Sequence, residues 1–395
     1  MSEVLNHRTD GEIGMVINHE VTDAVGDYPI REVSKESNEY ADSEELSEKL
    51  GVRGHASRVF CITHKEDVVQ FNQALKGLYP WISSHYREVG LEVAGSIIWN
   101  DSFVTTGNLL KNFRDYGLSV FFFGDKAHES IPNDSWHQIV KEMNEKNDFI
   151  ILCQKLGLAI PKTTCFNSRA ELDNANIDFS KKQWLKLSKS ISGMGSETVK
   201  SMDEVCRYLE NVKDGCRFQI QEDAGTDVFA SAQYYISDAG LSFVATTEQI
   251  LDGAIYKGNR GPVSYDLRPI TDPVANYMYK NGMRGYFGID VAVIKTNNGN
   301  QYKMLECNPR YTGASYPLLV ARRLGARNWN SMSYDINHSS LDFLDLSELA
   351  YDRTKKNGVV VINWGSVLYG SIGVVFLGNN EEEILRIKEK FEKLI

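Results

Sequence analysis

Hydrophobic residues in the first third of the chain form short runs separated by stretches with helical spacing. Residues 57–63 (SRVFCIT) form an apolar run typical of a buried strand, and residues 66–78 follow with helical spacing. Two further apolar runs occupy 93–99 and 118–124. Strands that alternate with helical stretches are typical of a parallel α/β sheet. We therefore expect an α/β unit over residues 1–138.

The remaining two thirds of the chain mix longer helical patterns with strand pairs. Apolar spacing predicts one long helix over 136–156, which Gly157 ends and which Pro161 prevents from continuing. Ser201 begins a predicted helix over 201–209, and a glutamate three residues later completes a capping box. The other predicted elements are a surface helix at 41–50, strands at 184–187, 218–221, 228–236, 241–250, 286–294, 302–307, 359–364 and 373–377, and helices at 274–281, 316–324 and 381–394.

The segment that says most about chemistry is residues 304–310, MLECNPR. Alternate residues of a strand share a face, so Glu306, Asn308 and Arg310 point the same way. A carboxylate and an amide oxygen suit a hard divalent cation, and an arginine one step further can reach anionic oxygens that the cation holds. A half-exposed edge strand with ordinary polar residues has the same pattern, so this segment alone leaves both interpretations open.

A second carboxylate, Asp290, lies on the strand that precedes this segment, across the turn signal NNGN at 297–300. A two-residue loop at 298–299 with unbroken pairing would place Asp290 opposite Cys307, on the core face. A three-residue loop would place it opposite Asn308, on the face of the polar residues. We therefore predict an odd-length loop or a β-bulge in this hairpin.

Composition limits the class of protein. The 395 residues include 43 Lys and Arg against 53 Asp and Glu, a formal net charge of −10. This acidic balance argues against nucleic-acid or anionic-membrane partners, and no apolar run approaches the ~18 residues of a membrane span. The start of the chain has no secretory pattern, and its six cysteines include no CxxC pair. We expect a cytoplasmic protein of two or three domains.

The central stretch of the chain contains no histidine between His137 and His338, so chemistry there would use carboxylates, lysines and arginines. Its loop 188–196 (SKSISGMGS) follows a strand that ends near Lys186. Small residues let backbone N–H groups approach phosphate oxygens, and lysine adds a charge. A flexible turn has the same composition, and no Walker A motif is present.

Taken in order, these pieces resemble the ATP-grasp superfamily. That family has a lysine before its lid, a second lysine on a lid strand before a Gly-rich loop, an adenine-binding hinge strand, and a Glu-x-Asn-x-Arg strand. Lys146 matches the first lysine and Lys186 the second, while FQIQEDAGTD at 218–227 matches the hinge. The resemblance covers about 143–324. Gln221 stands where members often have Glu, and the loop has only two glycines.

The resemblance implies a role for each matched residue. ATP would contact Lys146, Lys186, Ser192, Gly193, Gly195, Gln221, Glu222 and Asp227; Mg²⁺, with Mn²⁺ as a substitute, would bind Asp290, Glu306 and Asn308; and Arg310, Lys186 and Arg268 would be catalytic. Residues 247–262 resemble the Tyr-x-Gly loops of amide-forming members and would cover the acceptor side. Glu248, Lys257 and Arg260, with Arg310, would then contact substrate, although ordinary surface charges are the simpler interpretation of Lys257 and Arg260 individually.

The resemblance also implies an organisation and an activity. The domains would be a pre-ATP-grasp α/β domain at 1–138, an ATP-grasp domain at 139–330 with a lid at about 158–215, and a C-terminal appendage at 331–395. The implied activity is ATP-dependent joining of a small-molecule carboxylate to an amine, an amino acid or peptide, through an acyl phosphate with release of ADP. The resemblance is compatible with a homodimer, since many relatives are dimers, but it does not fix the oligomeric state. The alternatives are a carboxylating or phosphoryl-transferring member and a Mg·ATP-binding regulatory module without catalysis.

Overall fold

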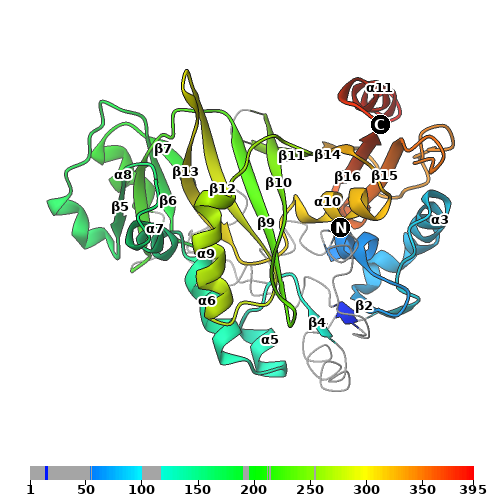
Figure 1. Cartoon of the computed structure of the whole chain (residues 1–395), viewed down its shortest axis with the longest axis horizontal. Helices are drawn as coiled ribbons and strands as arrows, with labels where there is room; N and C mark the ends of the chain where they lie inside the picture. The colour runs from blue at the N-terminus through cyan, green and yellow to red at the C-terminus, as the bar shows by residue number, and fades with distance from the viewer. Residues whose placement is uncertain are drawn as a thin grey trace, which may run out of the picture.

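Three sheets make up the computed structural model, which describes residues 14–16, 54, 56–99, 117–189, 195–210, 212, 215–252 and 255–395. A small lid sheet and an N-terminal sheet flank a central sheet of eight strands (Figure 1). The mixed α/β class predicted from the sequence is confirmed. In the part of the chain that is described, no helix combines the length and apolarity needed to cross a membrane.

The N-terminal sheet is parallel, as its alternating pattern predicts. It contains β1 (Gly14–Val16), β2 (Val68–Phe71), β3 (Ser96–Trp99) and β4 (Gly117–Ser119) in the order β3-β2-β1-β4. The helix α3 (Tyr79–Val89) links β2 to β3 and was not predicted. The predicted helix at 41–50 lies outside the described residues.

Two predictions in this region are wrong. The predicted strand at 57–63 is a 3₁₀ helix, η3 (Ala56–Ile62), and the predicted helix at 66–78 is replaced by β2 and a second 3₁₀ helix, η4 (Gln73–Gly77). A short apolar run buries its side chains equally well in either conformation, so its periodicity does not decide between them. Local hydrogen bonds decide here: the Thr63 hydroxyl donates to the Phe60 carbonyl at 2.8 Å.

The predicted long helix at 136–156 is also wrong, because it is two helices. After α5 (Asp125–Ser130), α6 (Asp134–Asn144) ends and α7 (Lys146–Lys155) begins on either side of Glu145, whose backbone is extended. The break lets the Lys146 N–H donate to the Ser188 carbonyl at 2.9 Å, and the Ser188 hydroxyl donate to the Glu145 carboxylate. The lid is thereby attached to the start of α7.

The lid is an antiparallel sheet in the order β5-β8-β6-β7. Its strands are β5 (Thr163–Phe166), β6 (Gln183–Leu187), β7 (Ser196–Val199) and β8 (Phe218–Glu222), with η5 (Arg169–Asn174) and α8 (Met202–Leu209) packed in the same apolar cluster. Ser201 caps α8 as predicted, since its hydroxyl accepts from the Glu204 N–H at 3.2 Å. The Glu204 carboxylate, however, accepts from the Lys200 N–H, so the reciprocal half of the capping box is absent.

The central sheet is antiparallel throughout, in the order β13-β12-β9-β10-β11-β14-β16-β15. The predicted elements are confirmed except the loop at 247–262, which is formed instead by the end of β10, by β11 and by a short connection between them. The bounds are β9 (Phe229–Ser237), β10 (Gly240–Asp252), β11 (Ile255–Gly261), α9 (Arg268–Lys280), β12 (Gly285–Thr296), β13 (Gly299–Asn308), α10 (Ser315–Arg323), β14 (Asn328–Asp335), β15 (Gly358–Asn363), η6 (Gly365–Tyr369), β16 (Ser371–Gly378) and α11 (Glu381–Phe391).

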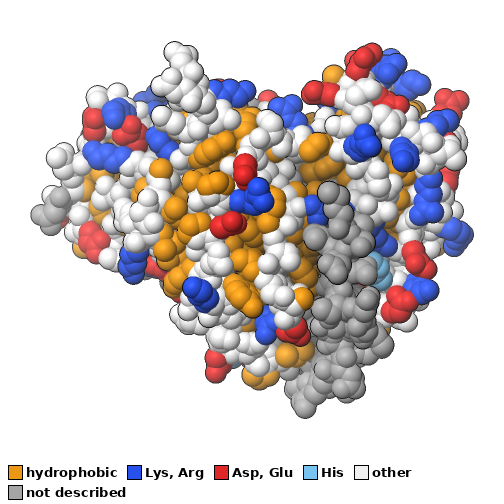
Figure 2. All heavy atoms as spheres, viewed as in Figure 1, with side chains coloured by type: hydrophobic (Ala, Val, Ile, Leu, Met, Phe, Trp, Pro, Cys, Tyr) orange, Lys and Arg blue, Asp and Glu red, His pale blue; other side chains and the backbone are white. Residues whose placement is uncertain are grey.

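The C-terminal strands β15 and β16 extend the same sheet that carries β12 and β13, because β14 joins β11 to β16. On the face in Figure 2, apolar side chains gather near the middle, and acidic and basic side chains are interspersed around them. The sheet therefore provides one continuous scaffold on which residues distant in sequence are held in fixed register.

Candidate functional site

The hairpin β12–β13 decides whether the two carboxylates share a face. Its turn is one residue earlier than either predicted loop, since Thr296 pairs with Gly299. Unbroken pairing from that turn would place Asp290 opposite Leu305. The register shifts between Asp290 and Val291, however, so that Asp290 pairs with Glu306. The predicted bulge is confirmed, and it places both carboxylates on one face.

Asp290, Glu306 and Asn308 form a compact polar cluster on this face. The Asn308 amide nitrogen donates to Asp290 Oδ2 at 3.1 Å and lies 3.5 Å from Glu306 Oε1. Burial and, after it, the negative charge of Glu306 raise the pKa of Asp290 to about 7. Two facing carboxylates in a partly dry environment repel each other, which favours a cation between them.

Three cationic side chains converge on this cluster from three different elements. Lys146, the first residue of α7, places its Nζ 2.7 Å from Glu306 Oε2. Burial acts to raise the pKa of Glu306, but the charges of Lys146, Lys186 and Arg310 outweigh it and hold that pKa at about 2. Glu306 is therefore ionised at neutral pH and is the negative centre of the site.

Lys186 reaches the site from the lid strand β6. Its Nζ donates to Gln221 Oε1 at 2.8 Å, and the Gln221 amide nitrogen donates to the Thr163 hydroxyl at 2.9 Å. Burial lowers the pKa of Lys186 to about 8, and the charge of Lys146 also lowers it. The ammonium group of Lys186 lacks a directly paired carboxylate in the described chain, so an additional anion would stabilise its charged form.

Arg310 is held in place by Asn144, the last residue of α6. Its guanidinium Nη1 donates to Asn144 Oδ1 at 2.8 Å, and its Cζ lies 5.8 Å from the centre of the Phe121 ring. Burial lowers the pKa of Arg310, although an arginine stays charged at any physiological pH. Asn144 and Phe121 were not predicted from the sequence, because only the tertiary fold brings α6 and residue 121 to the end of β13.

A further polar residue that the sequence analysis missed is Gln249. Its amide nitrogen lies 3.4 Å from Asp290 Oδ2. Strand pairing explains the contact, since Thr247 pairs with Ser231 and Ser231 with Asp290 across the sheet. Alternation then places Gln249 on the same face as Thr247. The alternation of side chains along β10 could have indicated Gln249, but only together with the register of β10 against β9 and of β9 against β12.

The same alternation places Glu248 on the opposite face of the sheet. Arg260 donates to its carboxylate at 2.9 Å through Nε, and Lys257 Nζ lies 3.8 Å from Asp335 Oδ2. Arg268 begins α9, pairs with Asp266 at 2.9 Å and is 53% exposed. The structure does not bring these four predicted residues to the acidic cluster, and their roles in substrate binding and catalysis stay predictions.

The residues predicted to contact the nucleotide lie in several different surroundings. Gly195 adopts a left-handed backbone (φ 79°), and its carbonyl accepts from the Leu187 N–H at 2.8 Å, while Ser192 and Gly193 lie outside the described residues. The Glu222 carboxylate contacts Lys181 Nζ at 2.8 Å, and Asp227 is exposed in the connection between β8 and β9. Gln221 lies beside Lys186, whose charge acts on Glu306.

The donor set of the cluster fits a hard divalent cation. It offers two carboxylates and one amide, which are the oxygen ligands that Mg²⁺ prefers. The Asn308 amide presents its nitrogen to both carboxylates, so its oxygen would have to turn inward to coordinate an ion. In the described residues no group of three or more His, Cys, Asp and Glu side chains is suited to a metal, so this mixed set is the candidate for the ion.

Comparison with known proteins assigns this part of the chain to a family. Residues 144–314, which span Lys146 to Arg310, match the model of the ATP-grasp domain. The resemblance to the ATP-grasp superfamily inferred from the sequence is therefore confirmed over these residues. No curated protein matches the chain.

Solved structures share the fold of the chain at low sequence identity. N5-carboxyaminoimidazole synthetase from Staphylococcus aureus, complexed with ADP, is 11% identical with a TM-score of 0.59, and 99% of each chain is covered. The Aspergillus clavatus N5-carboxyaminoimidazole synthase in complex with ADP and 5-aminoimidazole ribonucleotide is 12% identical with a TM-score of 0.54, covering 97% of this chain and 98% of that one. A biotin carboxylase from Campylobacter jejuni is 10% identical with a TM-score of 0.52, covering 87% and 89%. At these identities the likeness shows the fold alone.

Proposed function

We propose that this protein is an ADP-forming ligase that joins a small-molecule carboxylate to an amine at the site around Glu306. The observation that carries the proposal is the convergence of Lys146, Lys186 and Arg310 on a pair of facing carboxylates. Phosphoryl transfer depends mainly on positioning and on neutralising charge, and these groups supply both.

In this mechanism ATP lies between the lid and the central sheet. Lys146 and Lys186 hold its phosphates, with the loop that ends at Gly195, and Gln221 and Glu222 lie beside the adenine. Mg²⁺ bound by Asp290, Glu306 and Asn308 would neutralise phosphate charge. Lys186 would gain the anionic partner that it lacks among the described residues.

The reaction then has two steps. A carboxylate oxygen attacks the γ-phosphorus, the bond from that phosphorus to the β–γ bridging oxygen breaks, and ADP leaves. The amine nitrogen attacks the carbonyl carbon of the acyl phosphate, a proton leaves the nitrogen, and phosphate departs. Arg310 stabilises the negative charge on the acyl phosphate and on the tetrahedral adduct, because its planar guanidinium can bind two oxygens at once.

The substrates proposed are an amino acid or peptide carboxylate and a small amine. The structural neighbours suggest one competitor, since carboxylation of an amine uses bicarbonate as the carboxylate and the same acyl-phosphate chemistry. A phosphotransferase would stop after phosphoryl transfer, and a regulatory module would bind nucleotide without turnover.

One assay separates these possibilities. Purified protein is given Mg·ATP and, in turn, amino acids, dipeptides and bicarbonate, and ADP release is measured with and without hydroxylamine. A ligase gives carboxylate-dependent ADP and traps the acyl phosphate as a hydroxamate. Bicarbonate-dependent ADP release alone favours carboxylation. Substrate-dependent ADP without any hydroxamate contradicts an acyl phosphate, and nucleotide binding without turnover favours the regulatory module.

A further inference from the structure

A cavity of about 470 Å³ lies where two strands of the central sheet separate. The pairs between β10 and β11 begin at Glu248 and Arg260, and among the described residues no strand pairs with the first part of β10 on that side. The residues that follow β11, from Pro262 to Asp266, and the helix α10 form the remaining walls. The cavity is within the ~300–1,000 Å³ range of small-molecule sites.

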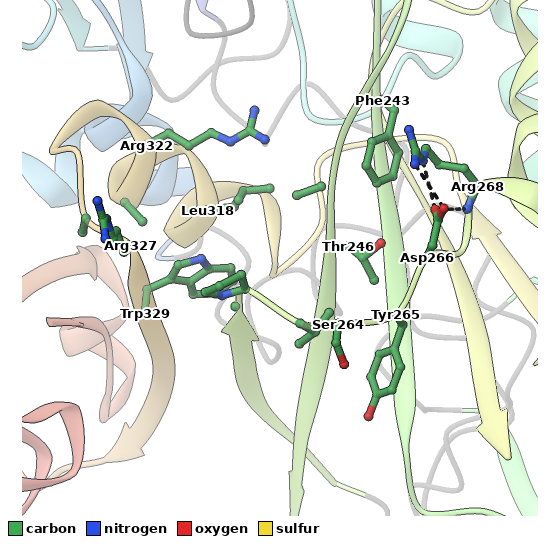
Figure 3. Close-up of a pocket in the computed structure, with 16 residues that line it drawn as sticks. Phe243, Thr246, Ser264, Tyr265, Asp266, Arg268, Leu318, Arg322, Arg327 and Trp329 are labelled. Atoms are coloured by element: carbon green, nitrogen blue, oxygen red, sulfur yellow. Dashed lines mark hydrogen bonds and ion pairs between the residues drawn. The ribbon is translucent and has the colours of Figure 1, made fainter. Parts of the chain in front are cut away.

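The walls of this cavity are aromatic and aliphatic on two sides. Trp329 approaches it from β14 and Phe243 from β10, on opposite sides in Figure 3. Leu318 from α10 and Pro262 add further apolar surface. Such walls favour a ligand with a flat or compact apolar body, because burying that body removes apolar area from water.

The charge of the lining is positive in a chain that is acidic overall. Three arginines line the cavity against a single aspartate, and Arg268 already pairs with that residue, Asp266, at 2.9 Å. Arg322 donates to the Val244 carbonyl, and burial lowers its pKa. Arg327 is exposed. Neither Arg322 nor Arg327 forms an ion pair with any residue that the structure describes.

The cavity is separate from the proposed nucleotide site. Arg322 lies at the C-terminal end of α10 and Leu318 near its middle, whereas Arg310 precedes its N-terminal end. The nine residues of α10 span about 13 Å. Of the residues predicted from the sequence to act in catalysis, only Arg268 lines this cavity.

We propose that this cavity binds a small organic anion, a carboxylate or a phosphate monoester carried on an apolar body of about the size of a benzene ring. Arg322 and Arg327 bind the anionic group, and Trp329 and Phe243 contact the body. An arginine without a carboxylate partner beside aromatic walls is the arrangement that recognises such amphipathic anions.

The test uses the full-length protein and four probes in isothermal titration calorimetry. Benzoate and phenyl phosphate carry both the body and the charge, benzamide carries the body alone, and inorganic phosphate carries the charge alone. Each titration is repeated with a saturating non-hydrolysable ATP analogue. At least one anionic probe should show binding when it is titrated to about 10 mM. Its affinity should be about tenfold higher than that of benzamide or inorganic phosphate, and the ATP analogue should leave it unchanged.

Variants place the binding in the cavity. Arg327→Gln should weaken the anionic probe about fivefold, and Arg322→Gln about tenfold, since a charged hydrogen bond is lost in each. Ser264→Trp, at an exposed position of the lining, should abolish binding by filling the cavity. Arg207→Gln, which removes an exposed arginine on α8, is the matched control and should leave affinity unchanged.

The results that overturn the proposal are equally definite. The proposal is wrong if neither anionic probe binds, or if benzamide binds as tightly as the anionic probes. It is also wrong if the ATP analogue displaces the probe, or if Arg327→Gln and Ser264→Trp leave the affinity for the probe unchanged. Benzoate bound without phenyl phosphate identifies the natural anion as a carboxylate, and the reverse identifies it as a phosphate monoester. Circular dichroism confirms that each variant is folded, and Arg327→Gln, at the surface, keeps the test decisive if Arg322→Gln unfolds.

Discussion

A half-buried polar region around Glu306 and a buried one between α3 and β15 differ in how their groups are paired. Around Glu306, ionised side chains from three elements face one another, and Asp290 lies beside a like charge. Where α3 meets β15, the polar groups are neutral and bind backbone. His85 Nε2 accepts from the Val361 N–H at 3.1 Å, and the Tyr86 hydroxyl donates to the Val361 carbonyl at 3.0 Å.

The difference shows which region serves structure and which serves binding. Neutral groups paired with backbone carry little desolvation cost and hold one arrangement. Buried charges of both signs cost several kcal/mol to desolvate and recover it only when every charge is paired. The core contact is therefore complete by itself, whereas the site around Glu306 would be completed by a cation and an anionic ligand.

The largest effect is expected from Glu306→Gln. Loss of this charge removes a proposed metal ligand and the partner of Lys146, so ADP release should fall by about three orders of magnitude or more. Thermal unfolding should stay within a few degrees of the wild type. Glu382→Gln, on the exposed first turn of α11, is the control. Full activity in Glu306→Gln would refute the site.

Phe60→Ala, in the core beside Tyr86, should instead reduce stability. Phe60 is fully buried and its ring contacts Phe71 and Tyr86, with centroids 5.6 and 5.5 Å away. Removal of a buried ring should cost about 3–5 kcal/mol of unfolding free energy, measured by urea denaturation. Phe60→Leu should cost clearly less. A similar loss in both variants would show that the packing around the ring is not the cause.

The pH dependence of stability should come partly from His85. Burial lowers its pKa to about 4, so the folded protein holds it neutral while the unfolded chain takes up a proton near pH 6.5. Stability is complete above pH 6.5 and falls as the pH drops towards 4, by about 3 kcal/mol from this group. Unfolding free energy against pH measures it, and His85→Gln should flatten the curve. An unchanged slope in that variant would exclude His85 as the cause.

A smaller effect is expected from Lys186 at alkaline pH. Its pKa of about 8 means that the ammonium is charged below that pH and neutral above it. Affinity for Mg·ATP should therefore fall about tenfold as the pH rises from 7 to 9, because a phosphate contact is lost. Lys186→Arg should bind with little change over this interval, since arginine stays charged. A parallel fall in both proteins would place the titration elsewhere.

The sequence predicted long elements well and short ones poorly. Strands β9, β10, β12 and β13 have enough alternating positions to define a face, and all four are present. The run at 57–63 is too short for its pattern to separate a strand from a 3₁₀ helix. The long helix failed at Glu145, where a contact with Ser188 in the lid overrides continuous helical spacing.

In the candidate site, too, some residues could be predicted from a local pattern and others could not. Residues clustered by strand alternation, such as Glu306 and Asn308, were found because two positions along one strand determine a shared face. Gln249 was missed, because its stretch was interpreted as a loop and the face of β10 depends on its register with β9. Asn144, which holds Arg310, left no local signal.

The sequence alone determined the chemical groups, their order along the chain and the need for an irregularity between Asp290 and Glu306. Those features follow from residue type and from the period of two in a strand, which are local. Only the tertiary structure decided that the turn is at 297–298, that the bulge falls after Asp290, and that α7 and the lid bring Lys146 and Lys186 to Glu306. Register and convergence depend on contacts between distant segments, and packing free energy selects those contacts over the whole chain.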